Sequence, residues 1–126
     1  MDDQVQRRQE KVAIKLLEKK KILGVKNGLP FLLNEIRAHW ALERCEGVLK
    51  LLRIHEECDF IALVLEYQPK GSLMGCLENE KQFSEHEVRV IMEQTLLALD
   101  FFERKHIVHR DIKPDNILIY SIEEQS

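Results

Sequence analysis

The residues best suited to chemistry lie together in one segment, residues 109–116. It reads His-Arg-Asp-Ile-Lys-Pro-Asp-Asn, so six of its eight residues are polar and five can ionise. Apolar residues flank it at 107–108 and 117–120, which places the polar group at the edge of a core. Catalytic groups concentrate in loops held by a rigid scaffold, and this segment fits that pattern. The alternative is a salt-bridged turn, because Asp, Pro and Asn all favour turns.

The first half of the chain predicts a small sheet and one helix. Val12, Ile14 and Leu16 alternate with other residues, as on one face of a strand. Apolar residues then recur at helical spacing up to Trp40. We read residues 1–10 as a hairpin end or frayed terminus, residues 19–21 as a solvated lysine surface, and residues 27–28 as a turn. The expected elements are a strand at 11–17, an amphipathic helix at 30–44, and two strands at 48–55 and 60–67 around a hairpin turn.

The second half predicts helices around the polar loop. Residues 68–71, Gln-Pro-Lys-Gly, break regular structure and mark the best boundary between two lobes. Ser84 followed by Glu87 is a capping-box pattern, which starts a long helix. We expect that helix to leave Met92, Leu96 and Phe102 exposed. The expected elements are helices at 72–79 and 84–105 and short strands at 107–108 and 117–120.

The order of these motifs resembles the eukaryotic protein kinases over about residues 11–120. Residues 109–116 look like that family's catalytic loop, in the form typical of its serine/threonine branch. Val-Ala-Ile-Lys, ending at Lys15, looks like its third strand, and Glu35 falls where its αC glutamate belongs. Residues 63–67 followed by 71–73 look like its fifth strand and hinge.

The resemblance implies transfer of a phosphoryl group from ATP to a hydroxyl of a protein substrate. It gives Asp111 the role of accepting the hydroxyl proton or orienting that hydroxyl, and Lys113 the role of neutralising the transferred group. It gives Asn116 a magnesium ion to hold through its amide oxygen, a hard ligand that Mg²⁺ prefers.

The resemblance also implies a nucleotide site. Lys15 contacts the phosphates and pairs with Glu35, which holds its flexible stem in place. An apolar slot takes the adenine base, and the hinge backbone bonds its edge. Each apolar member of the slot could equally be plain core. The slot and hinge residues are Ala13, Leu65, Glu66, Gln68 and Leu118.

We therefore expect an α+β fold that is a protein-kinase-like fragment: a small antiparallel sheet plus an αC-type helix, joined by a hinge to a partial helical lobe. Residues 1–67 form the partial N-lobe and residues 68–126 the partial C-lobe. No glycine-rich G-x-G-x-x-G precedes Lys15, and no Asp-Phe-Gly occurs up to Ser126. We expect this chain alone to bind ATP weakly and transfer little phosphate. The alternative is a non-catalytic kinase-like binding module or an incomplete gene product.

Composition narrows the partners further. The 126 residues carry a formal net charge of -3, and the pI is near 6.0, which argues against nucleic-acid binding through bulk charge. No apolar stretch approaches the ~18 residues of a membrane helix, and the N-terminus has no signal-peptide core, so we expect a cytoplasmic protein with no membrane partner. Three cysteines, odd in number and far apart, predict neither a zinc site nor a disulfide framework.

Overall fold

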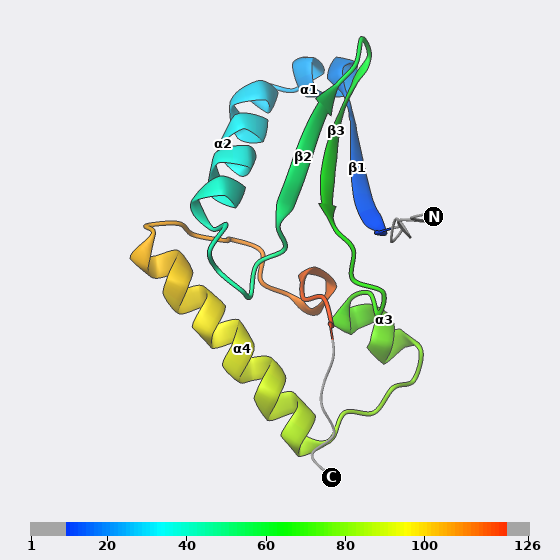
Figure 1. The fold of residues 1–126 in the computed structure, drawn as a ribbon, viewed down its shortest axis with the longest axis vertical. Coiled ribbons are helices and arrows are strands. Elements are labelled where there is room, and N and C mark those ends of the chain that lie inside the picture. The colour runs from blue at the N-terminus through cyan, green and yellow to red at the C-terminus, as the bar shows by residue number, and fades with distance from the viewer. Residues whose placement is uncertain (1–9, 121–126) are drawn as a thin grey trace, which may run out of the picture.

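A small antiparallel sheet and two long helices dominate the computed structural model (Figure 1). The structure describes residues 10–120; residues 1–9 and 121–126, which include most of the predicted hairpin end or frayed terminus, lie outside the described residues. The mixture of strands and helices confirms the predicted α+β class. The elements are β1 (Val12–Glu18), α1 (Lys19–Gly24), α2 (Gly28–Ala41), β2 (Leu51–Glu56), β3 (Phe60–Glu66), α3 (Leu73–Glu78), α4 (Glu85–Arg104) and the 3₁₀ turn η1 (Pro114–Asn116).

The sheet has the order β1-β3-β2, and both pairs are antiparallel. β2 and β3 form the predicted hairpin, closed by a bond from the Glu57 N–H to the Phe60 carbonyl oxygen at 2.9 Å. β3 is the central strand, and its Leu63 lies opposite Lys15 of β1. The register therefore places Lys15 in the middle of β1, an edge strand of the sheet.

One face of the sheet packs against α2. Leu32 and Ile36 of α2 form a buried cluster with Leu63, and Leu17 packs against this cluster. Side chains at alternate positions share a face, so Lys15 lies on the same covered side as Leu17. The apolar face predicted from Val12, Ile14 and Leu16 is the other one, and it is exposed. The alternation was right, but periodicity alone cannot tell which face a helix will cover.

The lysine run is exposed at Lys20 and Lys21, as the sequence predicted, and it also forms the first turn of helix α1. Lysine is a good helix former, and the Lys19 N–H donates to the Asp59 carbonyl oxygen at 2.9 Å, which ties the helix start to the hairpin. The predicted turn follows, with Asn27 in the left-handed region at φ 59°. A Cβ at Gly28 would overlap the backbone oxygen of Ile22, so only glycine fits this approach.

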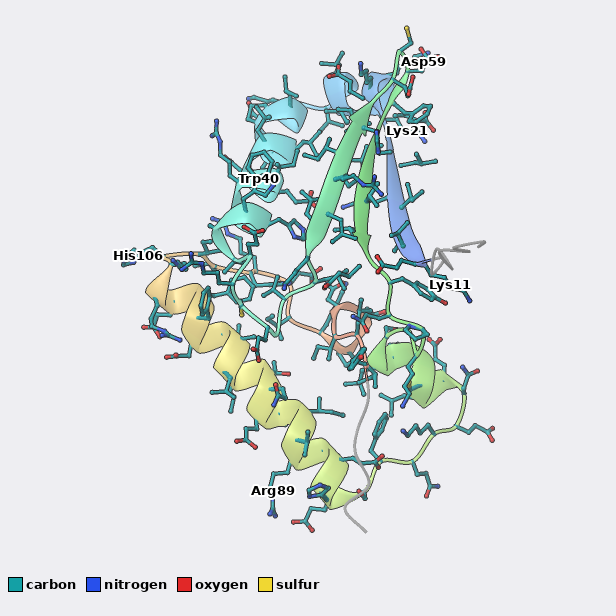
Figure 2. All side chains as sticks on the ribbon, viewed as in Figure 1. Lys11, Lys21, Trp40, Asp59, Arg89 and His106 are labelled. Atoms are coloured by element: carbon teal, nitrogen blue, oxygen red, sulfur yellow. The ribbon has the colours of Figure 1, made fainter. Side chains whose placement is uncertain are left out.

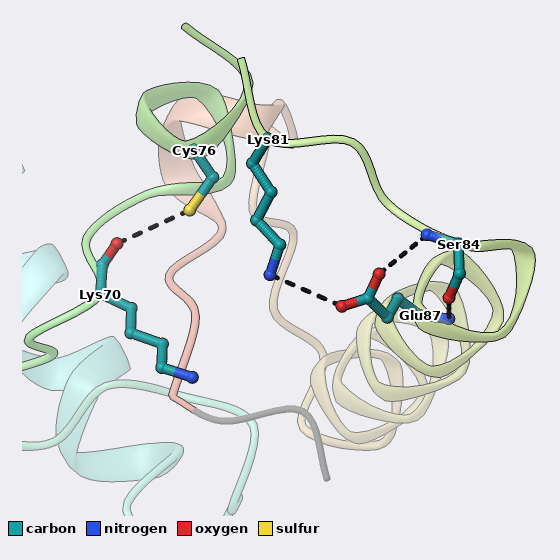
Figure 3. Close-up of polar contacts among 5 residues, drawn as sticks. All are labelled: Lys70, Cys76, Lys81, Ser84 and Glu87. Atoms are coloured by element: carbon teal, nitrogen blue, oxygen red, sulfur yellow. Dashed lines mark hydrogen bonds and ion pairs between the residues drawn. The ribbon is translucent and has the colours of Figure 1, made fainter. Parts of the chain in front are cut away.

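Helix α4 begins where the sequence predicted. The Ser84 hydroxyl accepts from the Glu87 N–H at 3.2 Å, and the Glu87 carboxylate accepts from the Ser84 N–H at 2.8 Å (Figure 3). Lys81 lies 3.5 Å from the same carboxylate. These contacts, the Ser84 N–H bond above all, hold the pKa of Glu87 below its ordinary value. The predicted capping box is confirmed.

The expected exposure along α4 is confirmed for two of three residues. Met92 and Leu96 are more than half exposed. Phe102 is half-buried, because its ring packs edge-on against His109 with centroids 5.9 Å apart. His106, in the turn that follows α4 (Figure 2), has φ 57° and turns the chain back toward the polar loop.

The predicted strands at 107–108 and 117–120 are wrong. The apolar residues are present, but a strand needs a ladder, and Leu118 makes only one isolated bridge, to Ser72. The Leu73 N–H donates to the Ile117 carbonyl oxygen at 2.7 Å, and the Ile119 N–H to that of Gly71 at 2.9 Å. Pairing stops there because Ser72 is already the N-cap of α3.

Candidate functional site

The predicted ion pair between Lys15 and Glu35 is present. The Lys15 Nζ lies 3.0 Å from a Glu35 carboxylate oxygen, with side chains 49% and 42% exposed. Contacts between exposed charges contribute little to stability. What the pair does is fix where the ammonium group points, since a lysine stem is otherwise flexible.

Packing of α2 on the sheet brings these two charges together. Ile36 is buried against Leu63, and Glu35 precedes it on the helix. The register places Leu63 opposite Lys15. The packing of this turn of α2 against the sheet therefore places the Glu35 carboxylate next to the Lys15 ammonium group of β1.

A second group of polar side chains gathers around Asp111. The Asn116 amide nitrogen donates to the Asp111 carbonyl oxygen at 2.9 Å and to its carboxylate Oδ2 at 3.1 Å. The Lys113 Nζ lies 3.6 Å from the same Oδ2. One carboxylate oxygen is thus held from two sides, which leaves Oδ1 of Asp111 and Oδ1 of Asn116 as the acceptors for other groups.

The backbone of this loop has an unusual conformation. Arg110 has φ 73°, in the left-handed region that residues with a Cβ rarely adopt. The next residue is held by the His109 ring, whose Nδ1 accepts from the Asp111 N–H at 3.1 Å. His109 also packs against Phe102 of α4. Strain of this kind persists only where the surroundings enforce it, and it concentrates at functional sites.

The polar loop is tied to the hinge. The bridge between Leu118 and Ser72 joins the end of the loop to the residues that follow β3, and Ile119 beside it is buried. Gly71, at φ 69°, supplies one of the flanking acceptors. These contacts place the predicted adenine residue Leu118 at the hinge, with 41% of its surface exposed.

The hinge itself carries Leu65, Glu66 and Gln68. Leu65 and Glu66 end β3, and Leu65 lies opposite Ala13 of β1; both side chains are half-buried. The Glu66 N–H donates to the Lys50 carbonyl oxygen at 3.1 Å, so that N–H is already used. The buried Gln68 Oε1 has no hydrogen-bond partner among residues 10–120.

The structure thus brings together four sets of predicted residues. Lys15 contacts Glu35, Leu65 lies opposite Ala13, and Leu118 pairs with Ser72 beside the hinge. Asp111, Lys113 and Asn116 form the fourth set. Lys50 was missed, and no sequence signal could have revealed it, because it contributes backbone groups only.

Comparison with known proteins decides the family. The protein kinase domain family matches residues 4–125. This chain belongs to the protein kinase family. Among similar curated proteins, calcium/calmodulin-dependent protein kinase type 1 of Macrobrachium nipponense is 31% identical over 91% of this chain and 32% of its own length. Maternal embryonic leucine zipper kinase of Danio rerio is 40% identical over 87% of this chain and 16% of its own length. Aurora kinase B of Mus musculus is 36% identical over 86% of this chain and 31% of its own length.

These relatives are longer proteins. This chain spans between 16% and 32% of the lengths of these three relatives. The small antiparallel sheet with α2, followed by α3 and α4, is the kinase-like α+β arrangement that the sequence predicted. Across residues 10–120, no helix is long and apolar enough to span a lipid bilayer.

Proposed function

We propose that this chain carries the nucleotide-binding and hydroxyl-positioning parts of a protein serine/threonine kinase domain. Residues 1–67 act as the partial N-lobe and residues 68–126 as the partial C-lobe, with ATP bound between them. The observation that carries the proposal is the arrangement around Asp111, where Asn116 and Lys113 hold one carboxylate oxygen and leave the other free. The string that carries Lys113 is typical of the serine/threonine branch.

Each residue has a separate task in the proposed reaction. Asp111 Oδ1 accepts the hydrogen bond of the substrate hydroxyl and orients it toward the phosphoryl group. Lys113 neutralises charge that develops on that group, and Lys15, held by Glu35, meets the α- and β-phosphates. Positioning and charge neutralisation carry nearly all of this chemistry.

One oxygen atom of this site is suited to bind Mg²⁺. The Asn116 amide nitrogen is occupied by Asp111, so its Oδ1 is the atom left for a cation. Among residues 10–120, no three His, Cys, Asp or Glu side chains are placed to hold a metal ion. Asn116 would therefore hold Mg²⁺ together with phosphate oxygens and water, as Mg²⁺ prefers. When bound, the ion neutralises phosphate charge.

The adenine site uses the hinge. Ala13, Leu65 and Leu118 line the base, and the Glu66 carbonyl and the Gln68 N–H meet its edge. The apolar members are half-buried or partly exposed, as a base-lining surface must be before ligand binds. The cytoplasmic location and the absence of nucleic-acid and membrane partners stay predictions from the sequence.

Titration of a fluorescent ATP analogue, with and without Mg²⁺, tests the proposal. Wild type should bind weakly and gain affinity from Mg²⁺, and Asn116→Ala should lose most of that gain. Asn34→Ala on the exposed side of α2 is the matched control and should behave as wild type. Binding that ignores Mg²⁺, or an Asn116→Ala variant that keeps the full gain, would contradict the assigned role of Asn116.

A phosphate-transfer assay tests the catalytic part of the proposal, above all the role of Asp111. We expect the 126-residue chain to transfer little radiolabelled phosphate from ATP to a basic protein substrate. A chain extended by a glycine-rich loop, an Asp-Phe-Gly segment and the remaining C-lobe should recover transfer, and Asp111→Ala in that chain should remove most of it. Failure of the extended chain, with binding intact, favours the alternative of a non-catalytic binding module. The exposed Met92 and Leu96 on α4 are the observation that supports that alternative.

A further inference from the structure

Glu66 makes two hydrogen bonds to one residue. Its N–H donates to the Lys50 carbonyl oxygen at 3.1 Å, and its carboxylate Oε2 accepts from the Lys50 N–H at 3.0 Å. A single side chain thus completes a closed ring with the backbone that leads into β2. The carboxylate bond is charge-assisted, which makes it stronger than a bond between neutral groups.

The sheet needs such an attachment at this end. The pairing of β2 with β3 is irregular between Leu51 and Arg53, where the register shifts. A bulge of this kind interrupts the ladder and bends the strand. Leu51 lies opposite Leu65, so the interruption falls beside the residues that lead into the hinge. The Glu66 carboxylate holds Lys50 on the far side of that interruption.

We propose that the Glu66 side chain positions the hinge backbone for the adenine base. This inference rests on the proposed function, in which the Glu66 carbonyl and the Gln68 N–H meet the base. By anchoring Glu66 to Lys50, the carboxylate fixes the direction in which the chain leaves β3. The side chain itself does not touch the nucleotide, so its effect is on orientation alone.

This positioning role should affect binding of the adenine base but not binding of the phosphates. Lys15 and Glu35 lie on β1 and α2, and the carboxylate of Glu66 is bonded to neither. Loss of the Glu66 carboxylate should therefore weaken ligands that contain adenine and spare ligands that contain only phosphate. A side chain that merely stabilises the fold would weaken both classes equally.

The test compares Glu66→Ala, Glu66→Gln and Lys50→Ala with wild type by NMR titration. The ligands are Mg·ATP, adenosine and inorganic tripolyphosphate with Mg²⁺. Glu66→Ala should bind ATP and adenosine about tenfold more weakly, the loss of roughly one charge-assisted hydrogen bond, and should bind tripolyphosphate as wild type does. Glu66→Gln keeps an acceptor oxygen and should recover most of the loss. Lys50→Ala keeps the N–H and should match wild type.

Amide exchange gives a readout that needs no ligand. The Lys50 N–H should exchange faster in Glu66→Ala than in Glu66→Gln. Equal loss of tripolyphosphate binding, unchanged adenosine binding, or unchanged exchange at Lys50 would overturn the inference. If wild type binds no nucleotide, the proposed function fails; if it binds and Glu66→Ala binds equally well, only this inference fails.

Discussion

Replacing Lys15 by Met, and Glu35 by Gln, separates the two tasks that this ion pair could have. Both substitutions keep the approximate length of the side chain and remove its charge. If the pair serves to aim the ammonium group at phosphates, the free energy of unfolding should hardly change while nucleotide affinity falls. If the pair instead holds α2 on the sheet, stability should fall first.

The contribution of this ion pair to stability can be worked out from the distance between its charged atoms and the exposure of its side chains. At the 3.0 Å separation of Nζ and Oε1, Coulomb's law in bulk water gives about 1.4 kcal/mol. Both side chains are more than two-fifths exposed, so screening and lost side-chain entropy reduce the net contribution to about 0.2–1 kcal/mol. A charge-assisted contact from Lys15 to a phosphate contributes about 1.5 kcal/mol or more, which is roughly tenfold in affinity.

A double-mutant cycle measures both quantities. Chemical denaturation of wild type, the two single variants and the double variant gives stability, and titration with Mg·ATP gives affinity. We expect Lys15→Met to lose about tenfold in affinity and Glu35→Gln up to about fivefold, with unfolding free energies within about 1 kcal/mol of wild type. Lys26→Met, a change of the same kind at an exposed position, is the control.

Two results would refute this reasoning. A stability loss above about 2 kcal/mol in either single variant would show that the pair holds the fold together. Unchanged affinity in Lys15→Met would show that Lys15 does not contact the phosphates.

Three further predictions concern stability. Gly28→Ala should destabilise the chain by about 1–3 kcal/mol in denaturant melts, because the new Cβ overlaps the Ile22 backbone. Ser84→Ala should cost about 1 kcal/mol by removing the cap of α4, and an unchanged melt would contradict the cap's role. The lowered pKa of Glu87 means that its carboxylate stabilises the folded state above its ordinary value of 4.5. Amide protection in the first turn of α4 should therefore hold from pH 7 to 5 and fall as pH drops further, and a rise on acidification would contradict this.

Repeated local signals predicted most of the fold. Apolar residues at helical spacing predicted α2, although it runs from Gly28 to Ala41 and not over 30–44. The pattern of Ser84 and Glu87 predicted the N-cap of α4, whose first helical residue is Glu85. α1 was not predicted, because its start is tied down by the distant Asp59, a contact that no local pattern encodes. The strand predicted at 117–120 failed for a related reason: its partner, Ser72, was needed to cap a helix.

The site was predictable to a similar extent. The pairing of Lys15 with Glu35 followed from a resemblance in motif order, and the structure confirms their proximity. The bonds from Asn116 to Asp111 join residues only five apart, yet their geometry depends on the left-handed turn at Arg110. The attachment of Glu66 to Lys50 uses a backbone N–H, which every residue except proline has, so the sequence could not single it out.

Neither α3 nor α4 has a buried residue, although α4 is the longest element of residues 10–120. The heat capacity change of unfolding grows with the apolar surface that unfolding newly exposes to water. Helix α4 already shows much of its apolar surface to solvent, so melting it adds little to that change. The stability of helix α4 should thus vary gently with temperature, while the sheet and α2, which bury Leu63 almost completely, give the calorimetric trace most of its curvature.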